Sequence, residues 1–281
     1  AALSLLESQN ATADSTYLKT CRWAAENCRS LAQFARAETI LNLGMLAADA
    51  VQNTPHESFR AGLLLEYAAL DAELSRFQQA GLHYTQAVEA LEKAFGKNSP
   101  KVATALTDWG NFENGSTRNF KSAEAKLARA MQILTPIARQ YPLEYLSALT
   151  AQARLYSYGV PRYRESRQML EKAVEFGEKH LGAQHTSLAW TLRVLAGYHQ
   201  DKTAYFYRAD TLNRQALAIY EGHFGRDYPG CVGALQDISG WYGSLGYAQK
   251  AAEVRQEAFE RIRKIYGDRH PETADLMLAF A

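Results

Sequence analysis

The sequence has almost no excess of charge of either sign and no long run of apolar residues. Its 281 residues include 31 basic and 30 acidic side chains, which gives a formal net charge of +1. Nucleic acids and anionic membranes attract strongly basic surfaces, so we expect no nucleic-acid partner. No apolar run approaches the roughly 18 residues that a membrane span needs. We therefore expect no transmembrane segment.

Cysteine is scarce: the chain has Cys21, Cys28 and Cys231 alone. On one helix, Cys21 and Cys28 would lie about 10 Å apart along the axis. A disulfide needs Cα atoms within about 7 Å, so we expect these two thiols to stay unpaired. Such cysteine usage weakly fits a reducing compartment. The localisation stays unknown, with a soluble cytoplasmic protein slightly favoured over a periplasmic or exported one.

The common signatures of catalysis are also missing. The seven histidines form no H-E-x-x-H zinc pattern, and no G-x-S-x-G nucleophile elbow occurs. The segment Gly96-Lys97-Asn98-Ser99 lacks the earlier glycine of a phosphate-binding loop. The sequence therefore predicts no enzyme activity, no cofactor and no metal site in these residues.

Small residues, in contrast, recur at a fixed period. The first series is Ala37, Ala80, Ala123, Ser166, Ala209 and Ala251, and the second is Gly44, Ala87, Ala130, Ala173, Ala216 and Ala258. Successive members lie 43 or 42 residues apart, and the two series are offset by seven residues, or two helical turns. A fixed period of roughly 20–50 residues is typical of a repeat array.

The junctions between repeats carry helix-ending and helix-starting residues. They read Phe95–Pro100, Leu181–Thr186, Phe224–Pro229 and Tyr266–Pro271, each with a glycine in second place. Glycine suits the position just after a helix, and proline suits the first turn of the next one. A softer break, such as Gly246, divides each repeat into two helices. The pattern predicts an all-α array of antiparallel helix pairs.

These residues resemble the tetratricopeptide repeat (TPR). Leu192-x-x-Leu195-Ala196 and Leu106-x-x-Trp109-Gly110 match its first helix, and Tyr156 and Tyr242 match its tyrosine. The 42–43-residue period and the Gly-x-x-x-Pro junctions are similar to the kinesin light chain subclass. The resemblance implies a right-handed α-solenoid of about six helix-turn-helix repeats plus a terminal helix.

The register places the repeats within a single domain over residues 1–281. The expected ranges are 13–54, 55–98, 99–141, 142–183, 184–226 and 227–268. Residues 1–12 are expected to form a leader helix or tail. Residues 269–281 are expected to be a capping helix or the truncated first helix of a further repeat, so the chain could be a fragment of a longer protein.

Some segments depart from the pattern. Thr135-Pro136 should break or kink the second helix of its repeat, because proline disrupts a helix interior. Residues 111–119 should form a polar turn, and residues 200–208 a loop that is polar and then aromatic. For Gly240, Gly243 and Gly246 we favour close helix packing and a turn over the approach of a partner backbone.

The resemblance also implies that the first helices line a concave face. The polar and aromatic residues at the matching positions are Arg22, Arg29, Thr107, Asn111, Asn114, Arg154, Trp190, Arg193, Gln200 and Gln236. Asparagine can pair with a peptide backbone, arginine can hold a carboxylate, and tryptophan is a common interface anchor.

We therefore expect a non-enzymatic protein–protein interaction scaffold or adaptor that binds a peptide or a partner helix in this groove. A merely solvated face is the other interpretation, and the turn edge is another possible binding surface. The alternative function is a regulatory or substrate-recognition TPR region of a larger protein, whose catalytic domain lies outside this chain. The sequence specifies neither the partner nor the oligomeric state.

Overall fold

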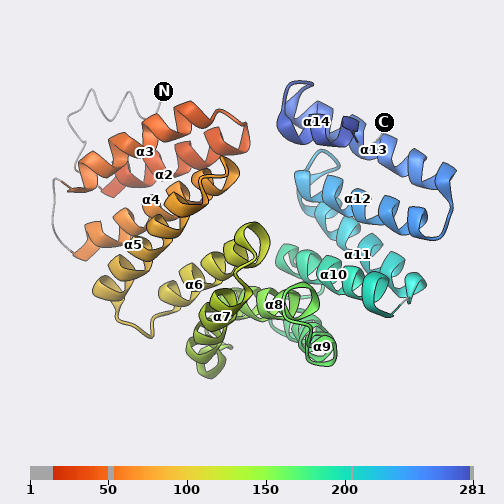
Figure 1. Cartoon of the computed structure of the whole chain (residues 1–281), viewed down its shortest axis with the longest axis horizontal. Helices are drawn as coiled ribbons and strands as arrows, with labels where there is room; N and C mark the ends of the chain where they lie inside the picture. Colours follow the sequence, from red (N-terminus) through yellow and green to blue (C-terminus); the bar gives the residue numbers. More distant parts are fainter. Residues whose placement is uncertain (1–14, 50–53, 204, 279–281) are drawn as a thin grey trace. The chain divides into compact units, whose positions relative to one another are not determined.

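The computed structural model describes residues 15–49, 54–203 and 205–278, and all regular structure in these ranges is helical. The chain divides into two compact units, residues 1–137 and 138–281. In both units consecutive helices pack as pairs (Figure 1). The expected leader at residues 1–12 lies outside the described residues.

The described residues of the first unit form three helix pairs. They are α2 (Ser15–Ser30) with α3 (Phe34–Asp49), α4 (Thr54–Glu73) with α5 (Phe77–Phe95), and α6 (Pro100–Phe112) with α7 (Phe120–Leu134). A π-helical turn, η1 (Glu113–Thr117), follows α6, and a 3-10 turn, η2 (Thr135–Ile137), follows α7.

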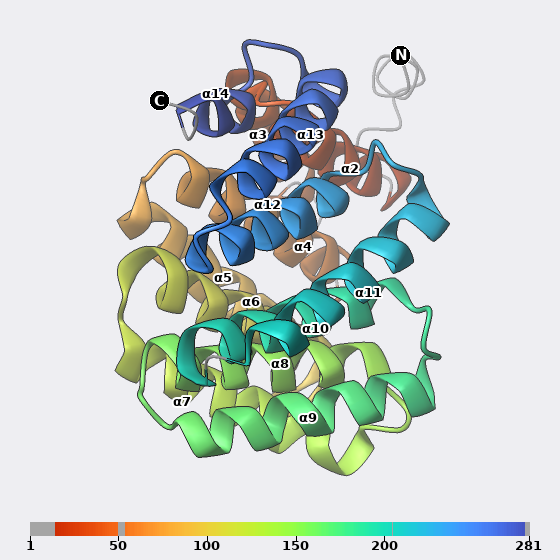
Figure 2. The same ribbon diagram turned by 90° about the vertical axis from the view of Figure 1, so that its right-hand side faces the viewer.

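The described part of the second unit forms three further pairs and a short helix after them, which can be followed in Figure 2. They are α8 (Pro142–Tyr158) with α9 (Tyr163–His180), α10 (Thr186–Tyr198) with α11 (Phe206–Phe224), α12 (Pro229–Ser244) with α13 (Ala248–Tyr266), and α14 (Pro271–Leu278). A second π-helical turn, η3 (His199–Thr203), joins α10 to α11. Each expected repeat range holds one helix pair, apart from Thr54, with which α4 begins. That the whole chain is one domain stays a prediction.

The periodic small residues lie where the two helices of a pair meet. Those of the first series from Ala37 to Ala209 have no exposed surface, and Ala251 is almost completely buried. Ser166 is the polar member: its hydroxyl donates to the carbonyl of Ala153 on α8 (2.7 Å) and contacts the Ser157 hydroxyl (2.6 Å). A serine is tolerated here because the buried hydroxyl is fully hydrogen-bonded.

The junction glycines behave as predicted. Gly96, Gly182, Gly225 and Gly267 all have φ between 80° and 96°, a conformation that side chains with a Cβ rarely adopt. Prolines begin α6, α8 and α12, and Ser99 caps α6 by accepting a hydrogen bond from the Val102 amide (3.3 Å).

The helix break predicted at Thr135-Pro136 is confirmed. Helix α7 ends at Leu134, and the two residues open the 3-10 turn. The boundary between the two compact units follows directly after this turn. The proline therefore ends the last helix of the first unit.

Two other irregular segments differ from the prediction. We expected a polar turn at residues 111–119 and a polar and then aromatic loop at residues 200–208, but the structure continues α6 and α10 into π-helical turns and begins α11 at Phe206. Burial explains the difference, because Glu113, Asn114 and His199 are all buried and need a hydrogen-bonded backbone around them.

The glycines of α12 also correct an expectation. Gly246 has a φ of 77° and forms the turn. At Gly240 and Gly243, however, a Cβ atom would meet no other atom within 4 Å. Close helix packing therefore does not explain these two glycines.

Other expectations concern groups that the fold buries or lacks. Cys21, Cys28 and Cys231 are buried, and Cys21 and Cys28 form no disulfide with each other. In the described ranges, no helix combines the length and the apolar character of a membrane span. The described residues also hold no group of three or more histidine, cysteine, aspartate or glutamate side chains that could bind a metal ion.

Candidate functional site

Predicted residues of the first helices in the second unit lie together around Trp190, and we call this surface the Trp190 groove. Trp190 on α10 is 42% exposed. The guanidinium carbons of Arg154 on α8 and Arg193 on α10 lie 5.9 and 5.5 Å from the centre of its ring. Three residues predicted separately therefore lie together, in an arrangement that favours cation–π attraction.

The two arginines differ in their partners. Arg193 Nε donates to Asp237 Oδ2 on α12 (2.7 Å), and its guanidinium packs on Gly233. Arg154 forms no hydrogen bond or ion pair with any described residue, although it is half-buried. Burial lowers the pKa of Arg154 and raises that of Asp237. A half-buried guanidinium with unused donors is a binding group for an anion.

A second set of polar contacts joins the C-terminal ends of the first helices in the second unit. Tyr158 Oη donates to Asp201 Oδ2 (3.1 Å), and Gln200 Nε2 donates to Ser244 Oγ (3.4 Å). The donor and the acceptor belong to neighbouring repeats in both cases. The predicted residue Gln200 is therefore engaged within the chain.

Three glycines lie against long side chains that belong to the preceding repeat. A Cβ at Gly62 would lie 3.1 Å from Arg22, one at Gly197 3.0 Å from Tyr158, and one at Gly233 2.6 Å from Arg193. We call this arrangement the glycine seat. The chain separation is 39 or 40 residues each time. These glycines keep the side chains flat on the next helix.

The first unit contains a groove of its own, with a volume of about 570 Å³, which we call the Asp108 groove. It lies among α2, α4 and α6. The predicted residues that line it are Arg22, Arg29 and Asn111. Arg29 pairs with Glu66 (3.5 Å) and with Glu73 on α4. Burial raises the pKa of the Glu66 carboxyl, in opposition to the charge of Arg29.

Three predicted residues do not serve as we expected. Thr107 is 1% exposed and donates to the carbonyl of Ala103 (2.9 Å) inside α6. Asn114 is buried in η1. Gln236 is exposed on α12, and no described contact joins it to the other predicted residues. We leave these three residues out of the candidate site.

The structure adds acidic residues that the sequence analysis missed. Glu66 and Asp108 line the Asp108 groove and Asp237 binds Arg193, whereas the neighbouring positions Thr107 and Gln236 had been chosen in two of these repeats. All three acids stand two residues after the consensus leucine of their repeats. An acidic residue at the same position of three repeats is therefore the sequence signal that could have found these residues.

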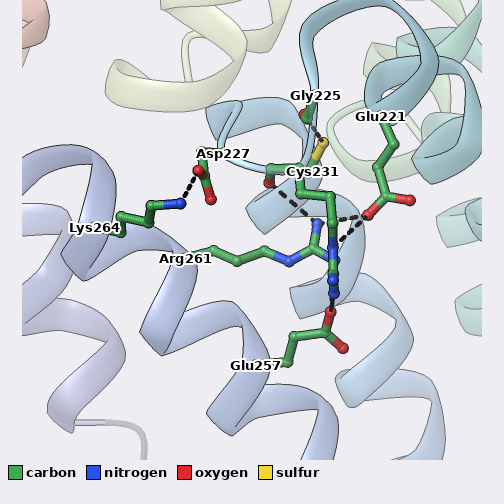
Figure 3. A network of polar contacts seen from close by, with 8 residues as sticks. Glu221, Gly225, Asp227, Cys231, Glu257, Arg261 and Lys264 are labelled. Atoms are coloured by element: carbon green, nitrogen blue, oxygen red, sulfur yellow. Dashed lines mark hydrogen bonds and ion pairs between the residues drawn. The ribbon is translucent and has the colours of Figure 1, made fainter.

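A third polar cluster lies at the junction between α11 and α12, on residues that line neither groove (Figure 3). Buried Arg261 on α13 contacts Glu221 (2.7 Å) and Glu257 (2.5 Å), and donates to the carbonyl of Arg226 (3.2 Å). Arg226 also pairs with Glu257 (2.7 Å). Every cation here has a carboxylate partner, so the cluster fixes the junction.

A similar arginine contact occurs at a junction of the first unit. Arg129 on α7 donates to Glu92 (2.5 Å) and to the carbonyl of Lys97 (3.0 Å), just after the junction glycine Gly96. Its recurrence at a second junction supports a structural role for both clusters.

Residues 153–187 match the sequence model of the tetratricopeptide repeat, and a search of curated proteins gives no match. BtubC (BKLC) from P. vanneervenii superposes with a TM-score of 0.60 at 18% identity, covering 92% of this chain and 95% of that one.

Two further solved structures are similar. The TPR-like repeats of a putative kinesin light chain from Podosopora anserina give a TM-score of 0.56 at 20% identity, with 74% of this chain and 97% of that one covered. A Rap protein complexed with Competence and Sporulation Factor gives 0.60 at 13% identity, with 95% and 87% covered. The chain thus contains a tetratricopeptide repeat and has the all-α solenoid fold of kinesin-light-chain-like repeat structures.

Proposed function

We propose that this chain is a non-enzymatic interaction scaffold that holds a segment of a partner protein in the Trp190 groove. A carboxylate of that segment binds Arg154, and an apolar side chain packs on Trp190. The observation that carries the proposal is the half-buried guanidinium of Arg154, which has no hydrogen bond or ion pair among the described residues.

Two further observations support it. Tetratricopeptide repeats are generally non-catalytic and mediate protein–protein interaction, and a similar solenoid has been crystallised with a bound factor. Arg193 is held in place by Asp237, so it can position the indole of Trp190 without competing for the carboxylate. The alternative, a recognition region of a larger protein, would use the same groove and stays a prediction.

The test uses an array of heptapeptides in pairs that differ only in a central glutamate or glutamine. We expect glutamate peptides to bind more tightly, and Arg154→Ala to weaken their binding by about ten- to a hundred-fold, the range of a hydrogen bond to a charged group. Dissociation constants are measured by fluorescence anisotropy.

Arg164→Ala is the matched control, because Arg164 is an exposed arginine on α9 in the same unit. It should leave glutamate-peptide binding unchanged. Equal binding of the glutamate and glutamine peptides, or equal losses in both variants, would overturn the proposal.

A further inference from the structure

The Asp108 groove has a different chemistry from the Trp190 groove. Its floor is formed by small or apolar residues of α4, namely Leu65, Ala69 and Ala72. The wall formed by α2 carries arginines, whereas the wall formed by α6 carries Asp108 and Asn111. The groove is therefore open, partly apolar and polar along both sides.

The groups on the α6 wall are unused. Arg29 on the opposite wall is engaged with Glu66 and Glu73. Asp108 and Asn111 form no hydrogen bond or ion pair with any described residue, although both line the groove. They are three residues apart, so they lie on one face of α6. A carboxylate and an amide are thus presented together.

Asp108 is an exposed residue, but its carboxyl is costly to ionise because the groove removes part of its hydration and Glu66 adds a negative charge. The other charged or titratable side chains that line the groove are Arg22, Arg29, Glu66, Glu73 and Tyr84. Lys126 on α7 forms an ion pair with Glu113 (2.9 Å). Loss of hydration and the negative charge of Glu66 raise the pKa of Asp108 to about 7. A cation in the groove would be attracted by both carboxyl groups.

We propose that the Asp108 groove is a second binding site, which takes an ammonium or guanidinium group of a partner polypeptide between Asp108 and Glu66. Asn111 pairs with the backbone of the same segment. The cation comes from a lysine or arginine side chain or from a free amino terminus. This site uses other helices and the opposite ligand charge from the Trp190 groove, so it does not rest on the proposed function.

The test uses heptapeptides that carry a neutral dye and, apart from the residue under test, no charged side chain. One pair, blocked at both ends, differs only in a central lysine or norleucine. A further pair without lysine or arginine has a free or an acetylated amino terminus. With the full chain at pH 8, we expect at least one cationic peptide to bind about tenfold or more tightly than its neutral counterpart.

Asp108→Asn should remove that advantage, and Glu89→Gln, at an exposed glutamate on α5, should leave it intact. The lysine pair and the amino-terminus pair distinguish the two sources of the cation. Circular dichroism checks that the variants are folded. Equal binding within both pairs, or an advantage that survives in folded Asp108→Asn, would overturn the proposal.

The pH dependence gives an independent readout. With a pKa of about 7, only about a tenth of Asp108 is ionised at pH 6 and about nine tenths at pH 8. Blocked lysine peptides should therefore bind roughly tenfold more tightly at pH 8 than at pH 6. Arg154→Ala should not change this binding, so failure of the Trp190 groove and failure of the Asp108 groove are distinguishable.

Discussion

At the residue scale, the burial and the pKa of a side chain depend on the residues that surround it in the folded chain. His199 has no exposed surface, and its Nδ1 lies 3.2 Å from the Thr203 hydroxyl within a π-helical turn. Burial, together with the charge of Arg208, lowers its pKa, and Glu171 opposes this only in part. Nothing in the local sequence marks such a turn, so this residue could not be predicted as buried.

His199 should make the protein sensitive to acid. Its pKa is lower in the folded chain than the value near 6.5 of an unfolded chain, so the folded state binds fewer protons. The stability it contributes is present above about pH 6.5 and is lost as the pH falls below that value. We expect the free energy of unfolding to fall less between pH 7.5 and pH 5.5 in His199→Gln than in the wild type.

Urea denaturation at the two pH values measures the effect. His223→Gln is the control, because His223 is exposed at the end of α11. It should keep the wild-type pH dependence. The same dependence in His199→Gln would show that His199 is not the responsible group.

At the element scale, the helices followed from the sequence but their rotation did not. The periodic small residues placed every helix pair, because close packing needs them at a fixed spacing. In two repeats the predicted position lies one residue from the acid that faces the groove, as with Gln236 beside Asp237. One residue turns a helix by about 100°, so a register that suffices for the fold can still choose the wrong face.

Two glycines test how tightly the helices pack. A Cβ at Gly110 would lie 2.7 Å from Leu127 Cγ and 3.4 Å from the Ala123 carbonyl, whereas one at Gly243 would meet nothing within 4 Å. Gly110→Ala should destabilise the protein by about 1–3 kcal/mol through overpacking. Gly243→Ala should stabilise it by about 0.5–1 kcal/mol, because alanine favours the helix. Thermal and urea denaturation of both variants measure this, and equal effects would contradict the packing described.

At the scale of the whole molecule, the array of helix pairs was predictable, whereas its division into two compact units was not. The proline at position 136 marks the boundary, but the sequence indicated only a local break in a helix. That Arg154 and Asp108 have no hydrogen-bond or ion-pair partner among the described residues was also out of reach, because an unsatisfied group is recognised only when all its neighbours are known. The residues of each repeat therefore predict the fold, whereas the candidate sites depend on contacts that only the structure shows.

Repeat proteins transmit instability mainly between neighbours. Leu195→Ala removes a buried side chain of the second unit and should cost about 2–5 kcal/mol. We expect hydrogen exchange to rise most in α8 to α12 and least in α2 to α4. A uniform rise along the whole chain would show that it unfolds as a single cooperative block.

The glycine seat has a consequence for how such a chain can change over evolutionary time. Arg22, Tyr158 and Arg193 each need a glycine that belongs to the following repeat. Duplicating, deleting or transplanting one repeat separates the long side chain from its glycine and sets it against a residue with a Cβ. The smallest module that recombination can move intact is consequently two adjacent repeats around Arg22 and three around Tyr158 and Arg193, although the period of the sequence is one.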